Sequence, residues 1–246
     1  MTEELELDTR PKTALVTGAT SGIGRAVALA LAADGFSVIV HGRDAARGAA
    51  TVEAIEQAGG NARFVAADLN DVAEVRRLAG AVGEVDVLVN NGGRSWFGAT
   101  ADLDTATYDA MFAANVRAAY YLVAALAPAM AKRGSGSIIS LSSMAGQVGL
   151  AGGAAYSATK VALEAMTRAW AAEFSPSGVR VNAVAPGPTF SDGADPGLIE
   201  QLGSTTLLNR GARVEEIADV IAFLASPKAG YVTGAIVAAD GGRTAV

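Results

Sequence analysis

The chain has 246 residues, of which 51% are hydrophobic, and a formal net charge of −6. This length and composition suit one large α/β domain with a substantial core, and the negative charge argues against a nucleic-acid surface. The chain has no cysteine and one histidine, which excludes disulfides and thiolate chemistry and leaves little for a metal site. A reducing cytoplasm is compatible with this composition, so we expect a cytoplasmic protein.

The N-terminal residues 1–11 are acidic at four positions and aperiodic, and we expect them to form a loose arm before a single domain of residues 12–246. Within that domain the apolar pattern predicts strands near residues 12–18, 37–42, 62–67, 85–90, 137–142, 179–185 and 235–239. Helical patterns lie between most of them. This alternation predicts an α/β fold in which helices cover both faces of a parallel sheet.

Two other segments stand out in the chain. The longest apolar run, Ala118 to Ala131, is shorter than the roughly 20 residues of a membrane helix and contains Pro128, so we interpret it as the end of a buried helix. Residues 187–213 are rich in Pro, Gly, Ser and Thr and form the least regular internal segment, with one short helix expected around Leu198 to Leu202.

A glycine-rich turn follows the first strand. Gly18, Gly22 and Gly24 stand between that strand and a helical pattern from Arg25 to Ala33. Positions without side chains let the backbone approach a pyrophosphate, and the helix N-terminus offers free N–H groups to its charge. A second strand follows at βαβ distance, so the turn predicts a dinucleotide site.

A phenol and an ammonium are neighbours further along the chain. Tyr156 and Lys160 are four residues apart in a helix-forming run, which places them on one helical face. A phenol has a pKa of about 10, and nearby positive charge lowers it. With Ser143, at the end of an apolar strand, these groups predict a site that moves a proton to or from a substrate oxygen. In isolation, an ordinary helix pair and a strand-closing serine remain open.

The motifs together resemble those of the short-chain dehydrogenases/reductases, over about Lys12 to Gly242 and including members that act as 3-oxoacyl-[acyl-carrier-protein] reductases. The resemblance rests on an ordered set of residues: Thr17-Gly18-x-x-x-Gly22-x-Gly24, Asn90-Asn91-Gly92-Gly93, Asn115, Ser143, Tyr156-x-x-x-Lys160 and Pro186-Gly187. It implies a three-layer Rossmann fold with a doubly wound, seven-stranded parallel sheet. It also implies nicotinamide-dependent hydride transfer, a mobile substrate loop at about 187–213 and a homo-oligomer, expected to be a tetramer.

The resemblance further implies roles for particular residues. Tyr156 serves as general acid/base, Ser143 holds the substrate oxygen, Lys160 lowers the tyrosine's pKa and reaches the nicotinamide ribose, and Asn115 organises a proton path. The implied cofactor contacts are Gly18, Thr20, Ser21, Gly22, Ile23, Gly24, Arg43, Asp68, Leu69, Asn91, Gly92, Tyr156, Lys160, Pro186, Gly187, Thr189 and Ser191. Plain alternatives are an exposed helical Asn115, an Asn90-Asn91 pair that ties strands together, and an Asp68 that caps the next helix.

The choice of cofactor depends on the end of the second strand. NAD sites usually place a carboxylate there for the ribose 2′-hydroxyl, whereas this chain has Gly42 followed by Arg43. An arginine binds a phosphate through paired hydrogen bonds, so we favour NADP(H), with NAD(H) as the alternative. One observation opposes this preference, because Ser21 stands where many NADP-dependent relatives have a basic residue. The alternative interpretation of Arg43 is a solvated charge at a strand end. His41 is interpreted as a strand-end packing residue.

The substrate is expected to be a small carbonyl or alcohol compound. Its pocket is predicted from Arg94, Ser95, Trp96, Met144, Gln147, Leu150, Pro188 and Phe190. Three functions remain open on the sequence: an NADP(H)-dependent reductase or alcohol dehydrogenase, the same fold run oxidatively with NAD, and a nucleotide-binding sensor or scaffold without turnover.

Overall fold

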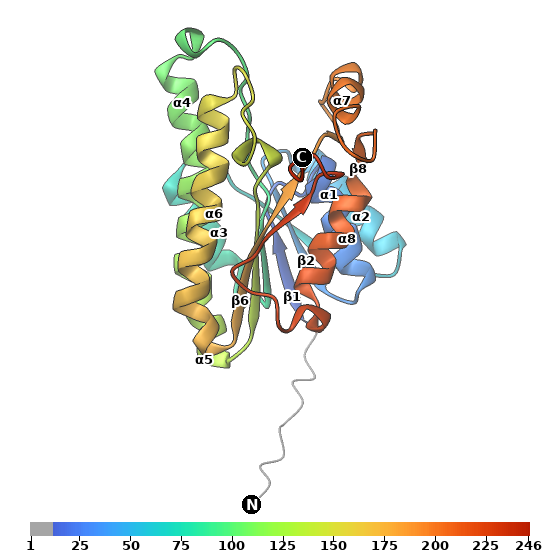
Figure 1. The fold of residues 1–246 in the computed structure, drawn as a ribbon. Helices are drawn as coiled ribbons and strands as arrows, with labels where there is room; N and C mark the ends of the chain where they lie inside the picture. The colour runs from blue at the N-terminus through green and yellow to red at the C-terminus, as the bar shows by residue number, and fades with distance from the viewer. Residues whose placement is uncertain (1–11) are drawn as a thin grey trace, which may run out of the picture.

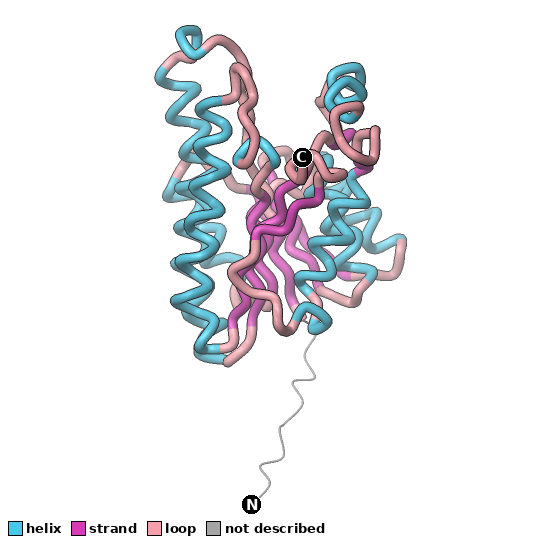
Figure 2. The backbone as a smooth tube through the Cα atoms, viewed as in Figure 1, coloured by secondary structure: helices cyan, strands magenta, loops and turns pink. Residues whose placement is uncertain are grey.

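A seven-stranded parallel sheet forms the centre of the computed structural model, which describes residues 12–246 (Figures 1 and 2). The arm expected at 1–11 lies outside the described residues. The strands are β1 (Thr13–Val16), β2 (Ser37–Gly42), β3 (Asn61–Ala66), β4 (Val87–Asn90), β5 (Gly136–Leu141), β6 (Val179–Pro186) and β9 (Ile236–Ala239). Their spatial order is β3-β2-β1-β4-β5-β6-β9. This confirms the doubly wound fold expected from the sequence, with the order reversing between β1 and β4.

The strands are apolar on both faces because both faces are covered by helices. In β1, Ala14 and Val16 pack in one hydrophobic cluster, while Leu15 between them packs in the other. Successive side chains of a strand point to opposite faces, so a continuous apolar run serves two cores at once. All three side chains are fully buried.

Helices cover the sheet in two layers (Figure 1). The α-helices of the described residues are α1 (Gly22–Ala33), α2 (Ala45–Gln57), α3 (Val72–Val82), α4 (Thr105–Phe112), α5 (Ala118–Arg133), α6 (Ala154–Phe174), α7 (Pro196–Gly203) and α8 (Val214–Ala225). One layer contains α1, α2 and α8, and the other contains α3, α4, α5 and α6. The carboxyl ends of all seven strands meet at one edge, where ligands bind in open α/β sheets.

One continuous helical stretch runs from Thr105 to Arg133, and the apolar run interpreted as the end of a buried helix forms its second half. A π-helical turn, Ala113–Arg117, joins α4 to α5 without a break, and Pro128 lies inside α5 rather than at its end. The helix stops where Gly134 adopts a left-handed φ of 73°. These 29 residues are long and apolar enough to cross a membrane, but 56% of their most apolar window is buried inside the fold. The stretch is therefore a core helix.

The irregular segment 187–213 contains α7 and a small parallel pair of strands, β7 (Thr189–Phe190) and β8 (Ala212–Arg213). The expected short helix around Leu198 is confirmed. The two strands have two residues each, which is too short for any periodic signal in the sequence. The pair closes the segment at its base, while α7 stands beyond the end of the sheet (Figure 1).

Candidate active site

The glycine loop between β1 and α1 is held from the side of β4. The hydroxyl of Thr17 accepts hydrogen bonds from the backbone N–H groups of Asn91 (3.0 Å) and Gly92 (2.8 Å). The Asn91 amide donates to the backbone oxygens of Thr17 (2.8 Å) and Gly18 (3.2 Å). A Cβ at Gly24 would lie well inside 3.0 Å of the Gly18 oxygen and the Asn91 amide. The approach is so close that only glycine fits at position 24.

Beside this loop lies a polar cleft of about 520 Å³. Its walls come from the carboxyl ends of β1, β2, β3 and β4 and from residues 191–192. The lining residues are Gly18, Thr20, Ser21, Gly22, Ile23, Gly24, His41, Gly42, Arg43, Arg47, Ala67, Asp68, Leu69, Asn70, Asn91, Gly92, Gly93, Arg94, Ser95, Ala114, Ser191 and Asp192. The side-chain-free turn, the helix N-terminus and the arginines fit an anionic dinucleotide. Within residues 12–246, no group of His, Asp and Glu side chains could hold a metal ion.

Most of the predicted cofactor residues meet in this cleft. Arg47 also lines the cleft, and it was not predicted from the sequence. It lies in the first turn of α2, where its Nε is 3.1 Å from the Asp44 carboxylate that caps the helix. Pro186, Gly187 and Thr189 lie at the end of β6 and in β7. These three residues do not line the polar cleft, whereas Ser191, which follows them in the chain, does.

The carboxylate of Asp68 is stabilised in its charged form. Hydrogen bonds from the Asn70 backbone and side chain lower its pKa, burial opposes them, and the charges of Arg43 and Arg94 lower it further. Arg94, predicted as a substrate residue, lines this polar cleft. The helix that follows is capped by Asp71, which accepts from the Ala73 N–H at 2.8 Å, so Asp68 is not its cap.

A second carboxylate lies where an anion is expected. Asp192, next to Ser191, accepts a hydrogen bond from the Gly22 N–H at 3.1 Å, at the N-terminus of α1. Helix N-termini carry a partial positive charge that favours such a contact. This contact could not be predicted from the sequence, because 170 residues separate the partners. Asp192 thus holds the segment 187–213 on the glycine loop.

Asp192→Asn is expected to tighten NADPH binding by about two- to fivefold, because the pyrophosphate then no longer competes with a carboxylate for the N-terminus of α1. Titration of nicotinamide fluorescence measures the change. Glu200→Gln, an exposed acid on α7 in the same segment, should leave the dissociation constant unchanged. Weaker binding by the Asp192 variant would show that the carboxylate supports the bound state instead.

The proton-transfer residues are close together at the start of α6. Lys160 Nζ lies 5.5 Å from the centre of the Tyr156 ring and donates a 2.7 Å hydrogen bond to the Leu141 backbone oxygen at the end of β5. Lys160 is 6% exposed. The pair is therefore not an ordinary solvated helix pair, since the lysine is fixed inside the protein beneath the tyrosine.

Burial shifts both of these groups. It raises the pKa of Tyr156, and the hydrogen bond with Ser143 partly opposes that rise. Burial also lowers the pKa of Lys160 from 10.5 to about 8. The lowering of the Tyr156 pKa by Lys160 that the resemblance implies stays a prediction, since burial and the Ser143 hydrogen bond are the influences on that pKa in this structure.

The side chains of Ser143 and Asn115 both make hydrogen bonds to backbone groups. Ser143 Oγ accepts from the Ala145 N–H at 3.1 Å and caps a short 3-10 helix, Met144–Gly146, so the capping alternative is true of it, while its role at the substrate oxygen stays a prediction. Asn115 lies in the π-helical turn and is 3% exposed, which rules out a solvent-facing asparagine. Its amide oxygen accepts from the Arg94 N–H, and its amide nitrogen donates to the Arg94 oxygen and to Thr159.

The predicted substrate residues do not share one cavity. Trp96 lines a separate cleft between α4 and the start of α6. Met144 is buried and Gln147 is exposed on the turn after β5. The sequence reading missed Phe97, whose half-exposed ring lies 5.3 Å from the Tyr156 ring, centre to centre. Phe97 is therefore in aromatic contact with the Tyr156 ring.

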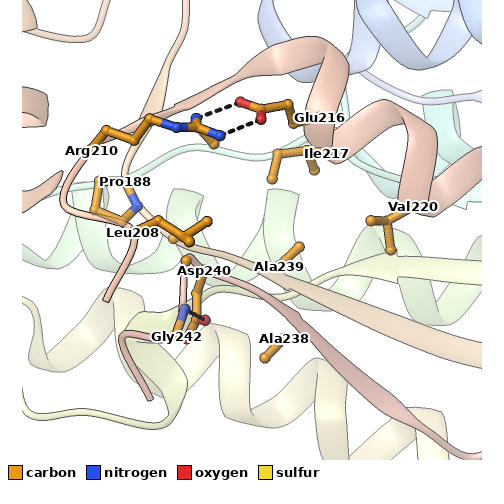
Figure 3. Close-up of a pocket in the computed structure, with 13 residues that line it drawn as sticks. Pro188, Leu208, Arg210, Glu216, Ile217, Val220, Ala238, Ala239, Asp240 and Gly242 are labelled. Carbon is orange, nitrogen blue, oxygen red and sulfur yellow. Dashed lines mark hydrogen bonds and ion pairs between the residues drawn. The ribbon is translucent and has the colours of Figure 1, made fainter. Parts of the chain in front are cut away.

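A second cavity, of about 260 Å³, lies behind the segment 187–213 (Figure 3). Pro188 lines it together with Leu208 and α8. At its rim Arg210 makes two hydrogen bonds to Glu216, of 2.8 and 2.6 Å, which lower the glutamate's pKa to about 2 with help from the Arg213 N–H. This fork fixes the far end of the segment to α8.

A sheet that reverses its order at a glycine turn, together with a partly buried Ser143 and Tyr156 and a buried Lys160, is typical of a nucleotide-dependent oxidoreductase. The family model for short chain dehydrogenases matches residues 12–196. The chain is 37% identical over 239 residues to a 3-oxoacyl-[acyl-carrier-protein] reductase of Staphylococcus aureus, covering 94% of this chain and 97% of that one. It therefore belongs to the short-chain dehydrogenase/reductase family.

Solved structures of similar proteins contain nucleotides. One is described as a putative NAD(P)-dependent gluconate 5-dehydrogenase from Beutenbergia cavernae with bound NADP, and it matches with a TM-score of 0.91 and 36% identity over 96% of this chain and 97% of that chain. Another is a blue fluorescent protein from a metagenomic library in complex with NADPH, with a TM-score of 0.89 and 37% identity over 94% of this chain and 97% of that chain. The protein is thus an NAD(P)-dependent oxidoreductase that acts on CH–OH groups.

Proposed function

We propose that this protein is an NADP(H)-dependent reductase of a small ketone, reversible as an alcohol dehydrogenase. The observation that carries the proposal is the set of Ser143, Tyr156 and the buried Lys160, together with a polar cleft that Arg43 and Arg47 line. A bound nicotinamide supplies or accepts the hydride. The remaining chemistry belongs to the residues of this chain.

In reduction, Tyr156 gives its phenolic proton to the carbonyl oxygen, which Ser143 holds by a hydrogen bond. A tyrosine whose pKa is raised by burial keeps this proton until the oxygen develops negative charge. Lys160 holds positive charge beneath the ring and connects it to the end of β5. The Asn115 side chain is bonded to Arg94 and Thr159, so it is not free to carry the proton itself.

Thr20 and Gly42 support the preference for NADP(H). A Cβ at position 42 would overlap with the Thr20 side chain, so the carboxylate that selects NAD has no room there. Arg43 and Arg47 take its place at the cleft. Arg47 supplies the second basic group, which makes up for the serine at position 21.

Arg43→Ala is expected to weaken NADPH binding by roughly 10- to 100-fold, because one charge-assisted bond to the 2′-phosphate is lost. NADH has no such phosphate, so its dissociation constant should change by less than about threefold. Arg168→Ala, an exposed arginine on α6, serves as the control. Equal losses for both nucleotides would place Arg43 outside the phosphate site.

For the substrate we propose a ketone carried on a small apolar or oxoacyl framework. Phe97, exposed beside Tyr156, gives the site an apolar wall. A panel that contains 3-oxoacyl thioesters, cyclic keto acids and keto sugars, each assayed by NADPH consumption, tests the proposal.

We further propose a homotetrameric, cytoplasmic protein, and sedimentation velocity measures its assembly.

The third function left open by the sequence, a nucleotide sensor without turnover, is disfavoured by membership of this enzyme family. It is favoured only by the tight anchoring of the segment 187–213 at Asp192 and Arg210, which a sensor could use to report nucleotide binding. Turnover with any member of the substrate panel rejects it.

A further inference from the structure

His41, the only histidine of the chain, lies at the end of β2 under the glycine loop. It is 2% exposed. Its backbone oxygen accepts from the Ala19 N–H at 2.8 Å. Its ring contacts the chain on two sides, at Gly18 through Nδ1 (3.2 Å) and at Ala67 through Nε2 (3.1 Å). The ring therefore connects the glycine loop to the end of β3.

These two contacts fix the state of the ring. The Gly18 N–H can only donate, so Nδ1 must be bare, and the Ala67 oxygen can only accept, so Nε2 must carry the proton. A protonated Nδ1 would point a donor at a donor. Burial lowers the pKa of His41 to about 4, although the Ala67 oxygen and the nearby Asp68 carboxylate raise it, and the ring is neutral near pH 7.

Gly18 needs this support because of its conformation and surroundings. Its φ is +64°, and a Cβ there would meet the Gly92 Cα at 2.8 Å. Thr17 and Asn91 hold the loop from the side of β4. His41 alone holds its amide from the side of β2, among the contacts that the structure describes.

We propose that His41 is a positioning residue for the cofactor: its bare Nδ1 fixes the Gly18 amide and so keeps the glycine loop in the shape that receives the pyrophosphate. This inference rests on the proposed nucleotide-dependent function. In this role His41 supports the glycine loop through a specific hydrogen bond and is more than the packing residue expected from the sequence.

Two substitutions separate the two ring contacts. The amide oxygen of His41→Asn reaches about as far as Nδ1 and can accept from Gly18, whereas the amide of His41→Gln reaches about as far as Nε2 and bonds to Ala67. Each variant loses one ring contact and part of the ring volume, so similar losses of thermal stability are expected. NADPH affinity should fall by roughly 5- to 100-fold in His41→Gln and by less than about threefold in His41→Asn.

The test combines fluorescence titration of NADPH with thermal melting of both variants. Equal affinity losses in the two variants, or unchanged affinity in both, would overturn the inference. The wild-type protein adds a measurement that needs no variant: the ¹⁵N spectrum of the single histidine should show a bare Nδ1 and a protonated Nε2, and the Gly18 amide should be protected from hydrogen exchange. The opposite tautomer or an unprotected amide would overturn it as well.

The wild-type titration also separates this inference from the proposed function. Failure of the unmodified protein to bind NADPH or NADH contradicts the proposed function. The tautomer and the protection of the Gly18 amide would still decide whether His41 holds the loop.

Discussion

Replacing Tyr156 with phenylalanine is expected to lower turnover by about 10²- to 10⁴-fold, which is the usual contribution of a positioned general acid or base. The ring keeps its contact with Phe97 and its place over Lys160, so the fold and NADPH affinity should change little. The measurement compares kcat/KM with the NADPH dissociation constant, using the best ketone from the substrate panel. The loss should appear only in turnover.

The control for this variant is Tyr120→Phe. Tyr120 lies on α5 with its ring half-exposed, edge-on to Tyr121 and away from the site, so removal of its hydroxyl should leave both quantities unchanged. Near-normal turnover of the Tyr156 variant would remove the tyrosine from the mechanism. A parallel loss of NADPH affinity would show instead that its hydroxyl acts in binding.

Gly24→Ala is expected to weaken NADPH binding by roughly 100-fold or more, because the added methyl displaces the Gly18 oxygen or the Asn91 amide. The same overlap should lower the free energy of unfolding by about 1–3 kcal/mol. Both effects come from one displaced loop. Urea unfolding and fluorescence titration of the same preparation measure them together.

Gly80→Ala is the matched control, because Gly80 also lies in a helix but has no atom within 4 Å of an added Cβ. It should raise the free energy of unfolding by about 0.5–1 kcal/mol and leave NADPH binding unchanged. Unchanged binding by the Gly24 variant would mean that the loop adapts, contrary to the close approach seen here.

Much of the fold could be predicted because the signals are local. The strand at Thr13–Val16 is a continuous apolar run followed by glycines, and α1 shows a helical period, so their order along the chain already defined a βαβ unit. The short helix α7 also carried a local signal, with Asp195 as its cap and Pro196 in its first turn. Its neighbours β7 and β8 have no periodic pattern, so only the tertiary structure reveals them.

The site was predicted less completely because its remaining contacts join distant residues. The π-helical turn that buries Asn115 has no signature in Ala113–Arg117. The charge of Arg94 acts on Asp68, which follows another strand, and the contact between Asp192 and Gly22 joins segments 170 residues apart. His41 was interpreted as packing because a lone strand-end histidine gives no sign of its hydrogen-bond partners.

A titration of the purified protein with NADPH and with NADH, followed by nicotinamide fluorescence, is the sharpest test of the proposed function. We expect saturable binding of both nucleotides, with NADPH bound about tenfold or more tightly, since Arg43 and Arg47 line the cleft and are proposed to bind the 2′-phosphate. Tighter binding of NADH would contradict the cofactor assignment. Binding of neither nucleotide would contradict the proposed oxidoreductase activity itself.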